Sequence, residues 1–109
     1  MNDFQVLTQE LLRFRDERDW SQFHNPKDLA LAISIEAGEL LELFLWKNPE
    51  DAPVERVKEE LADIISFVLL MAEKYHLDIK SIVSEKIIMN GVKYPVDKSK
   101  GNASKYTDP

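Results

Sequence analysis

Four acidic residues lie inside the two most apolar stretches of the sequence. They form two copies of an acid-x-x-acid pattern, Glu36-Ala-Gly-Glu39 and Glu60-Leu-Ala-Asp63. A spacing of three residues puts both acids of a pair on one face of a helix. Two adjacent antiparallel helices can therefore point all four carboxylates at a common centre. Charges in apolar surroundings are costly unless they are paired or bound to a metal, and no Lys or Arg lies near enough in sequence to neutralise all four.

A bound divalent cation is the leading candidate for neutralising these four negative charges. Mg²⁺ prefers oxygen ligands and commonly bridges carboxylates to phosphates, and Mn²⁺ is the alternative ion. We therefore predict a metal site formed by Glu36, Glu39, Glu60 and Asp63. Glu42 lies three residues after Glu39, and either of these two could orient or deprotonate a water molecule. The alternative is that the acids are solvated or paired with basic side chains, as is usual on helices.

A second metal motif is much weaker. Glu73-Lys-Tyr-His76 is a Glu-x-x-His step of the kind found in di-iron helix bundles. Such sites need two of these steps and two further Glu residues, whereas this chain has one step and only one other histidine, His24. His76 fits better as a partner of a helix C-terminus, and the di-iron interpretation is disfavoured.

Two further groups of residues could recognise a ligand. Aromatic rings near an acidic metal centre can stack on a nucleobase, which makes candidates of Trp20, Phe23, His24 and Trp46. The alternative, which applies above all to Phe23, is that such rings fill the junction between helix ends. Donor side chains also recur at steps of three and four residues, and these could contact phosphates or a sugar: Lys86, Asn90, Lys93 and Tyr94.

The elements that must position these residues are helices. Hydrophobic spacing and capping signals predict four of them, over about 3–18, from Pro26 to about Trp46 or Lys47, from Pro53 to about Tyr75, and from about Ile79 to Val92. We expect an all-α fold with a four-helix bundle domain over residues 1–94 and a non-helical tail over 95–109. The second and third helices are apolar on almost every face. One chain of 109 residues has too little bulk to bury both, which predicts a homo-oligomer.

Composition narrows the class of protein. The chain has no cysteine, which excludes disulfides and thiolate chemistry, and its net charge of −6 argues against a nucleic-acid binder. The first six residues, MNDFQV, have neither the basic flank nor the apolar core of a signal peptide, and the apolar runs are too short and too interrupted by acids to span a membrane. We expect a cytoplasmic protein.

Several segments together resemble one known family. They are residues 17–26 (ERDWSQFHNP), 36–46 (EAGELLELFLW), 59–64 (EELADI), 86–95 (KIIMNGVKYP) and 105–108 (KYTD). This order resembles the MazG-like, all-α nucleoside triphosphate pyrophosphohydrolases, and within them the dCTP pyrophosphatase branch. The resemblance covers nearly the whole chain. Two positions depart from the pattern of the dCTP-specific animal members, which carry His where this chain has Leu11 and Tyr where it has Phe67.

The resemblance implies an enzyme that hydrolyses a (deoxy)nucleoside triphosphate, dCTP or a related deoxynucleotide, to the monophosphate and pyrophosphate. It implies Mg²⁺ on the four carboxylates, Trp20 and Trp46 on either side of the base, and the Lys86 to Tyr94 donors lining the nucleotide site across a subunit boundary. It also implies a tetramer built as a pair of tight dimers. Two alternatives from other classes are a non-enzymatic helical interaction module and a protein that binds a metal–nucleotide complex without hydrolysing it.

Overall fold

The computed structural model describes residues 1–105 and 107, and within these ranges every regular element is helical. The last motif of the sequence falls partly outside them, because Tyr106 and Asp108 are not among the described residues. The chain separates into two compact units, Met1–Leu77 and Asp78–Pro109, each of which is described by itself. The all-α fold class is confirmed. No helix within the described ranges combines the length and the apolar character needed to cross a membrane.

The first two α-helices begin at strong local capping signals. Helix α1 (Asp3–Glu17) starts at Asn2, whose side chain accepts a hydrogen bond from the Gln5 backbone N–H at 2.9 Å, and the Gln5 side chain reciprocates. A single 3₁₀ turn, η1 (Ser21–Phe23), leads to helix α2 (Pro26–Glu42). Asn25 caps α2 by accepting from the Asp28 N–H at 2.9 Å, with Pro26 at the first helical position, as predicted.

Helix α2 is shorter than the sequence predicts. Its α-helical bonding ends at Glu42 rather than at Trp46 or Lys47. Beyond Glu42 the backbone continues in tight turns whose N–H groups reach three residues back rather than four, as in Leu45 to Glu42 at 3.2 Å. Trp46 then takes a left-handed conformation, with φ of 59°, which an α-helix cannot accommodate.

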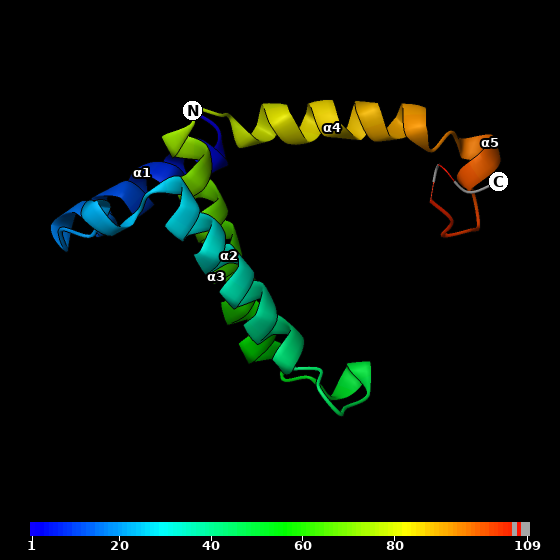
Figure 1. The fold of residues 1–109 in the computed structure, drawn as a ribbon, viewed down its shortest axis with the longest axis horizontal. Coiled ribbons are helices and arrows are strands. Elements are labelled where there is room, and N and C mark those ends of the chain that lie inside the picture. Colours follow the sequence, from blue (N-terminus) through cyan, green and yellow to red (C-terminus); the bar gives the residue numbers. More distant parts are fainter. Residues whose placement is uncertain (106, 108–109) are drawn as a thin grey trace. The chain divides into compact units, whose positions relative to one another are not determined.

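Helices α2 and α3 form the body of the first unit. After the 3₁₀ turn η2 (Pro49–Asp51), α3 (Val54–Lys74) returns antiparallel to α2 and lies beside it, while α1 packs against α3 (Figure 1). The core is small, and its fully or nearly fully buried apolar residues are Leu29, Leu43, Leu69, Leu70 and Ala72. Large apolar side chains of α2 and α3 stay exposed, including Leu31, Ile35, Leu41, Leu61 and Ile65.

The second unit contains α4 (Ile79–Lys93) and the single-turn helix α5 (Val96–Ser99). Asp78 caps α4 by accepting from the Ser81 N–H at 3.0 Å, in agreement with the predicted start. The expectation of a wholly non-helical tail after Pro95 is wrong at one point, because α5 lies within it. Pro95 takes an extended conformation, and its carbonyl accepts bonds from Lys98 and Ser99 at 3.0 Å, which closes this turn. The four-helix bundle and the domain boundary at residue 94 stay predictions.

Candidate metal centre

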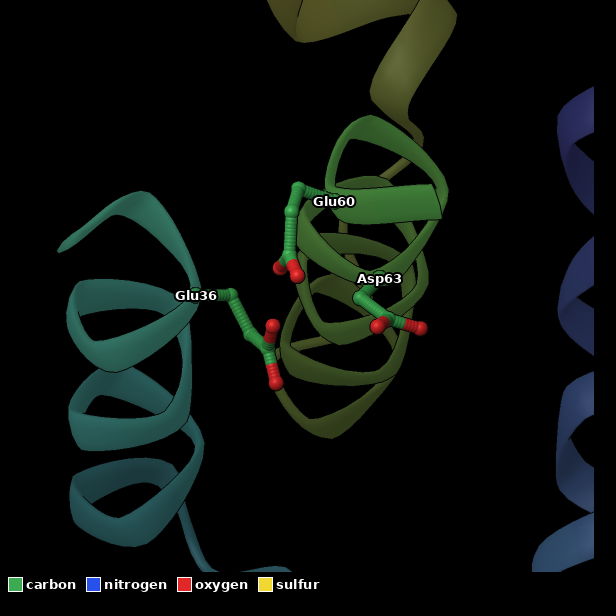
Figure 2. Close-up of side chains that lie close together, drawn as sticks. All are labelled: Glu36, Glu60 and Asp63. Atoms are coloured by element: carbon green, nitrogen blue, oxygen red, sulfur yellow. The ribbon is translucent and has the colours of Figure 1, made fainter. Parts of the chain in front are cut away.

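Three of the four predicted metal ligands converge between α2 and α3. Glu36 projects from α2 toward α3, and Glu60 and Asp63 project from successive turns of α3 (Figure 2). One carboxylate oxygen from each of the three lies within 4.8 Å of the others. The antiparallel pairing of α2 and α3 therefore brings one acid of the first motif to both acids of the second.

The burial of these acids is unequal. Glu60 is buried, with 6% of its surface exposed, whereas Glu36 is half-buried and Asp63 is exposed. Glu36 Oε2 and Glu60 Oε2 are both shielded from solvent, and neither has a hydrogen-bond partner among the described residues. An ionised carboxylate can only accept hydrogen bonds, so a buried oxygen without a donor is costly. A bound cation would remove that cost at both atoms, so the residues present fit a divalent metal.

The pKa of Glu36 also shows that the negative charges of the cluster are not neutralised by the chain itself. The pKa of Glu36 is raised from 4.5 to about 7, first by hydrogen bonding to the Glu60 carboxyl, then by burial, and then by Glu39 and the charge of Asp63. Two carboxyl groups can share a hydrogen bond only when one of them carries a proton. Without a cation, the cluster therefore relieves its repulsion by keeping a proton on Glu36 near neutral pH.

The remaining acidic candidates lie further along α2. Glu39 is exposed one turn after Glu36, and it raises the pKa of Glu36 both by hydrogen bonding and by its charge. It is therefore close to the cluster, although it is not one of the three residues whose oxygens lie within 4.8 Å of one another. Glu42 is the last residue of α2 and is exposed. The metal role of Glu39 and the catalytic roles of Glu39 and Glu42 stay predictions.

His24 lies against α3 one turn beyond Asp63. Its half-buried ring makes an edge-to-face contact with Phe67, with 6.5 Å between the ring centroids. Burial lowers the pKa of His24, and the nearby positive charges of Arg15 and Lys74 lower it further, so the imidazole is neutral at pH 7. Its buried Nδ1 atom has no hydrogen-bond partner among the described residues.

The two tryptophans differ in their surroundings. Trp20 packs edge-on against Phe14 with 5.9 Å between centroids, and 44% of its surface is exposed. Trp46 is 94% exposed, at the left-handed position that follows α2. The Arg18 guanidinium also lies 6.0 Å above the Trp20 ring, whereas the exposure of Trp46 leaves its indole open to a ligand or to another subunit.

The predicted donor residues lie on the second unit. Lys86 and Asn90, one turn apart on α4, line the same open hollow of about 470 Å³ together with Ile82, Val83 and Ile87. Lys93 is the last residue of α4 and Tyr94 follows it directly. The assignment of these four residues to substrate binding stays a prediction.

One further hollow was not anticipated from the sequence. It is a groove of about 380 Å³ between α1 and α3, lined by Leu7, Glu10, Leu11, Phe14, Ala62, Ile65, Ser66 and Leu69. On each helix the lining residues follow the same i, i+3, i+4, i+7 pattern. This spacing can be read from the sequence, but the sequence could not show that the two helices leave a space between these residues.

Comparisons with known proteins identify the family and the fold. The model of the MazG-like family matches residues 31–108. The mouse protein dCTP pyrophosphatase 1 is 43% identical, with the match covering 87% of this chain and 61% of the mouse protein, and its human counterpart is 37% identical with the same coverage. The crystal structure of a pyrophosphatase from Archaeoglobus fulgidus superposes with a TM-score of 0.78 at 35% identity, over 87% of this chain and 94% of that one.

The chain belongs to the MazG-like family, as its sequence motifs predict. It spans about 61% of the length of the mammalian relatives that it matches. Its similarity to the archaeal pyrophosphatase covers nearly all of that protein.

Proposed function

We propose that this protein hydrolyses a deoxynucleoside triphosphate, dCTP or a related nucleotide, to the monophosphate and pyrophosphate. The observation that carries the proposal is the convergence of Glu36, Glu60 and Asp63, with two buried carboxylate oxygens that receive no hydrogen bond from any described residue. The names of the mammalian and archaeal relatives support the same reaction. We further propose that the ion is Mg²⁺, held by these three residues and Glu39.

Bound Mg²⁺ would supply positive charge for the phosphate oxygens and a template that orients them. The protein's own part is to position a water molecule, and exposed carboxylates at the end of α2 suit that role. Glu39 or Glu42 would accept the proton of the attacking water. The water oxygen then bonds to the α-phosphorus, the bond from that phosphorus to the bridging oxygen of the β-phosphate breaks, and pyrophosphate leaves.

The remaining predicted residues have roles in holding the substrate. Lys86 and Lys93 would offset the charge of the leaving pyrophosphate, with Asn90 and Tyr94 as neutral donors. Trp20 and Trp46 would stack on the base, and His24, being neutral, would donate or accept one hydrogen bond.

The apolar surface that stays exposed on α2 and α3 supports a homo-oligomer. Patches of this kind on a small chain usually mark an interface with another protein. In keeping with the family resemblance, we propose a tetramer assembled from two tight dimers, with the nucleotide site completed across the dimer interface. Sedimentation of the full chain would measure its mass.

The decisive experiment is a panel of deoxynucleoside triphosphates with MgCl₂, in which pyrophosphate and orthophosphate are measured separately. We expect pyrophosphate only. Orthophosphate as the first product would contradict attack at the α-position, and nucleotide-dependent thermal stabilisation without any product would identify the protein as a nucleotide binder instead.

A matched pair of variants tests the metal assignment. Asp63→Asn removes one charge from the cluster and should lower activity by more than about 100-fold while leaving the oligomer folded. Glu55→Gln removes one charge from the same helix at an exposed ion pair with Lys58, 3.6 Å away, and should leave activity unchanged. Full activity of Asp63→Asn would refute its role as a ligand.

A further inference from the structure

Helix α2 has a second apolar face on the side away from the metal centre. Each residue of a helix turns the chain by about 100°, so Gly38 lies about 160° around α2 from Glu36, which projects toward α3. Three large apolar side chains lie within about 60° of Gly38, and they are 51%, 60% and 69% exposed: Leu31, Ile35 and Leu41. An exposed apolar face of this kind marks a surface that another protein covers.

Gly38 lies in the middle of this face, and the chain itself gives no reason for a glycine there. Inside a helix such as α2, glycine lowers the folding equilibrium constant by about fivefold relative to alanine. A Cβ atom placed on Gly38 would meet no described residue within 4 Å, apart from the adjacent backbone of α2 itself. Its φ is not positive either, because Gly101 is the one described glycine with a positive φ. The remaining reason for a glycine is the close approach of a surface from outside the chain.

The spacing of residues around Gly38 fits a second copy of the same face. Ile35 lies three residues before Gly38 and Leu41 lies three residues after it, so a two-fold axis at Gly38 places these two side chains opposite each other. The same axis places Ser34 opposite Glu42, and both are exposed. A hydroxyl donor then meets a carboxylate acceptor, and no two like charges face each other. A two-fold homodimer requires a surface that is complementary to itself in this way.

We propose that the face of α2 around Gly38 binds the same face of a second copy, with the two helices antiparallel and crossing at Gly38. The absence of side chains at the crossing point lets the helices approach closely while Ile35 of each copy packs on Leu41 of the other. This inference rests on the proposed homo-oligomer and identifies one of its interfaces. The metal centre remains uncovered on the other side of α2. Glu42 then contacts the second copy, which leaves Glu39 as the proton acceptor of the proposed reaction.

A disulfide tests the crossing point directly, because the chain has no cysteine of its own. In Gly38→Cys the two copies of residue 38 meet at the two-fold axis, within the Cα separation of about 4.4–6.8 Å that a disulfide spans. Mild oxidation should therefore convert most of the full chain to a covalent dimer on a non-reducing gel. Ile35→Cys is the matched control on the same exposed face. At a rise of about 1.5 Å per residue, its two copies lie about 9 Å apart along the helices and should stay unlinked.

Gly38→Ala tests the same contact without oxidation. On a free surface, alanine would raise the folding equilibrium constant by about fivefold and leave the oligomeric mass unchanged. At the crossing point, the two added Cβ atoms push the helices apart. We therefore expect the self-association constant, measured by sedimentation equilibrium, to fall by at least about tenfold. The mass should fall to that of a dimer if the wild type is a tetramer.

The outcomes separate this inference from the proposals on which it rests. An oligomeric wild type whose Gly38→Cys variant stays unlinked would show that another surface, of this chain or of a different protein, covers α2. Equal cross-linking of Gly38→Cys and Ile35→Cys would indicate random collision and overturn the two-fold axis. A Gly38→Ala protein with a higher Tm and unchanged association would overturn the inference as well. A monomeric wild type would refute the homo-oligomer together with this interface, whereas pyrophosphate release, measured separately, tests the proposed reaction.

Discussion

Replacement of Glu60 by Gln changes the charge at the centre of the acidic cluster while keeping the shape of the side chain. Two unit charges 4.8 Å apart repel each other by about 3.5 kcal/mol at an effective dielectric constant of about 20. Water screens part of this repulsion because Asp63 is exposed and Glu36 is only half-buried. We therefore expect the free energy of unfolding of the metal-free protein at pH 8 to rise by about 1 kcal/mol, or about 5 °C in Tm.

The pH dependence of this gain follows from Glu36. Its pKa is raised to about 7 in the folded protein, so the protonated form contributes stability that is fully present below pH 4.5 and is lost as the pH rises through 7. Glu60→Gln removes the largest cause of that raised pKa. The stability of the metal-free variant should then decline less between pH 4.5 and 7 than that of the wild type, and the gain should be largest at pH 8.

Mg²⁺ should reverse the order of stability, so that the wild type becomes more stable than Glu60→Gln. The wild type gains stability from a cation that satisfies Glu36 Oε2 and Glu60 Oε2, whereas the variant has lost a ligand and part of the charge that holds the ion. Thermal unfolding followed by circular dichroism, at pH 5 and 8 with and without MgCl₂, measures the effects of pH and of the ion on stability. A concentration of about 5 mM MgCl₂ is sufficient for a weak site. Glu55→Gln serves as the control for an unrelated loss of charge.

Two results would refute the reasoning. A metal-free Glu60→Gln protein that is less stable than the wild type at pH 8 would show that the Glu60 charge is compensated within the chain. Equal stabilisation of both proteins by Mg²⁺ would show that the ion, if it binds, does so elsewhere.

Two further predictions concern metal affinity and helix α2. The affinity for Mn²⁺ can be measured by electron paramagnetic resonance of the free ion. It should fall by up to about tenfold for each pH unit below 7, because Glu36 must lose its proton to bind the metal. An affinity that stays constant between pH 5.5 and 7 would exclude Glu36 as a ligand. Asn25→Ala should lower the free energy of unfolding by about 1 kcal/mol in urea denaturation, because the Asp28 N–H loses its 2.9 Å hydrogen bond. Asn25→Ser should retain most of the stability, since its hydroxyl can accept the same bond and places no second carboxylate beside Asp28, whose side chain accepts a 2.7 Å bond from Asn25 Nδ2.

The helix starts could be predicted because they depend on short-range contacts. The capping bonds at Asn25 and Asp78 each join residues three apart, so the signal and its partner lie in one short segment. The position at which a helix ends depends more on contacts with residues that are distant in the sequence. The residues from Leu43 to Trp46 include neither Gly nor Pro, yet α2 ends at Glu42, just before the buried Leu43. Likewise, the helix-breaking residues around Pro95 led to the prediction of a non-helical tail, although the tail contains the single turn of α5.

The sequence by itself determined that this chain is helical, that its acids come in pairs one helical turn apart, and that it belongs to the MazG-like family, because periodicity and motif order are properties of the chain alone. It could not decide which carboxylates meet, since that depends on the register between α2 and α3. The tertiary structure decided that Glu36, Glu60 and Asp63 share a centre, where two buried carboxylate oxygens have no hydrogen-bond partner in the part of the chain that the structure describes. It also decided that α1 and α3 leave a hollow of about 380 Å³ between them, because the bulk of a side chain matters only opposite the face it meets.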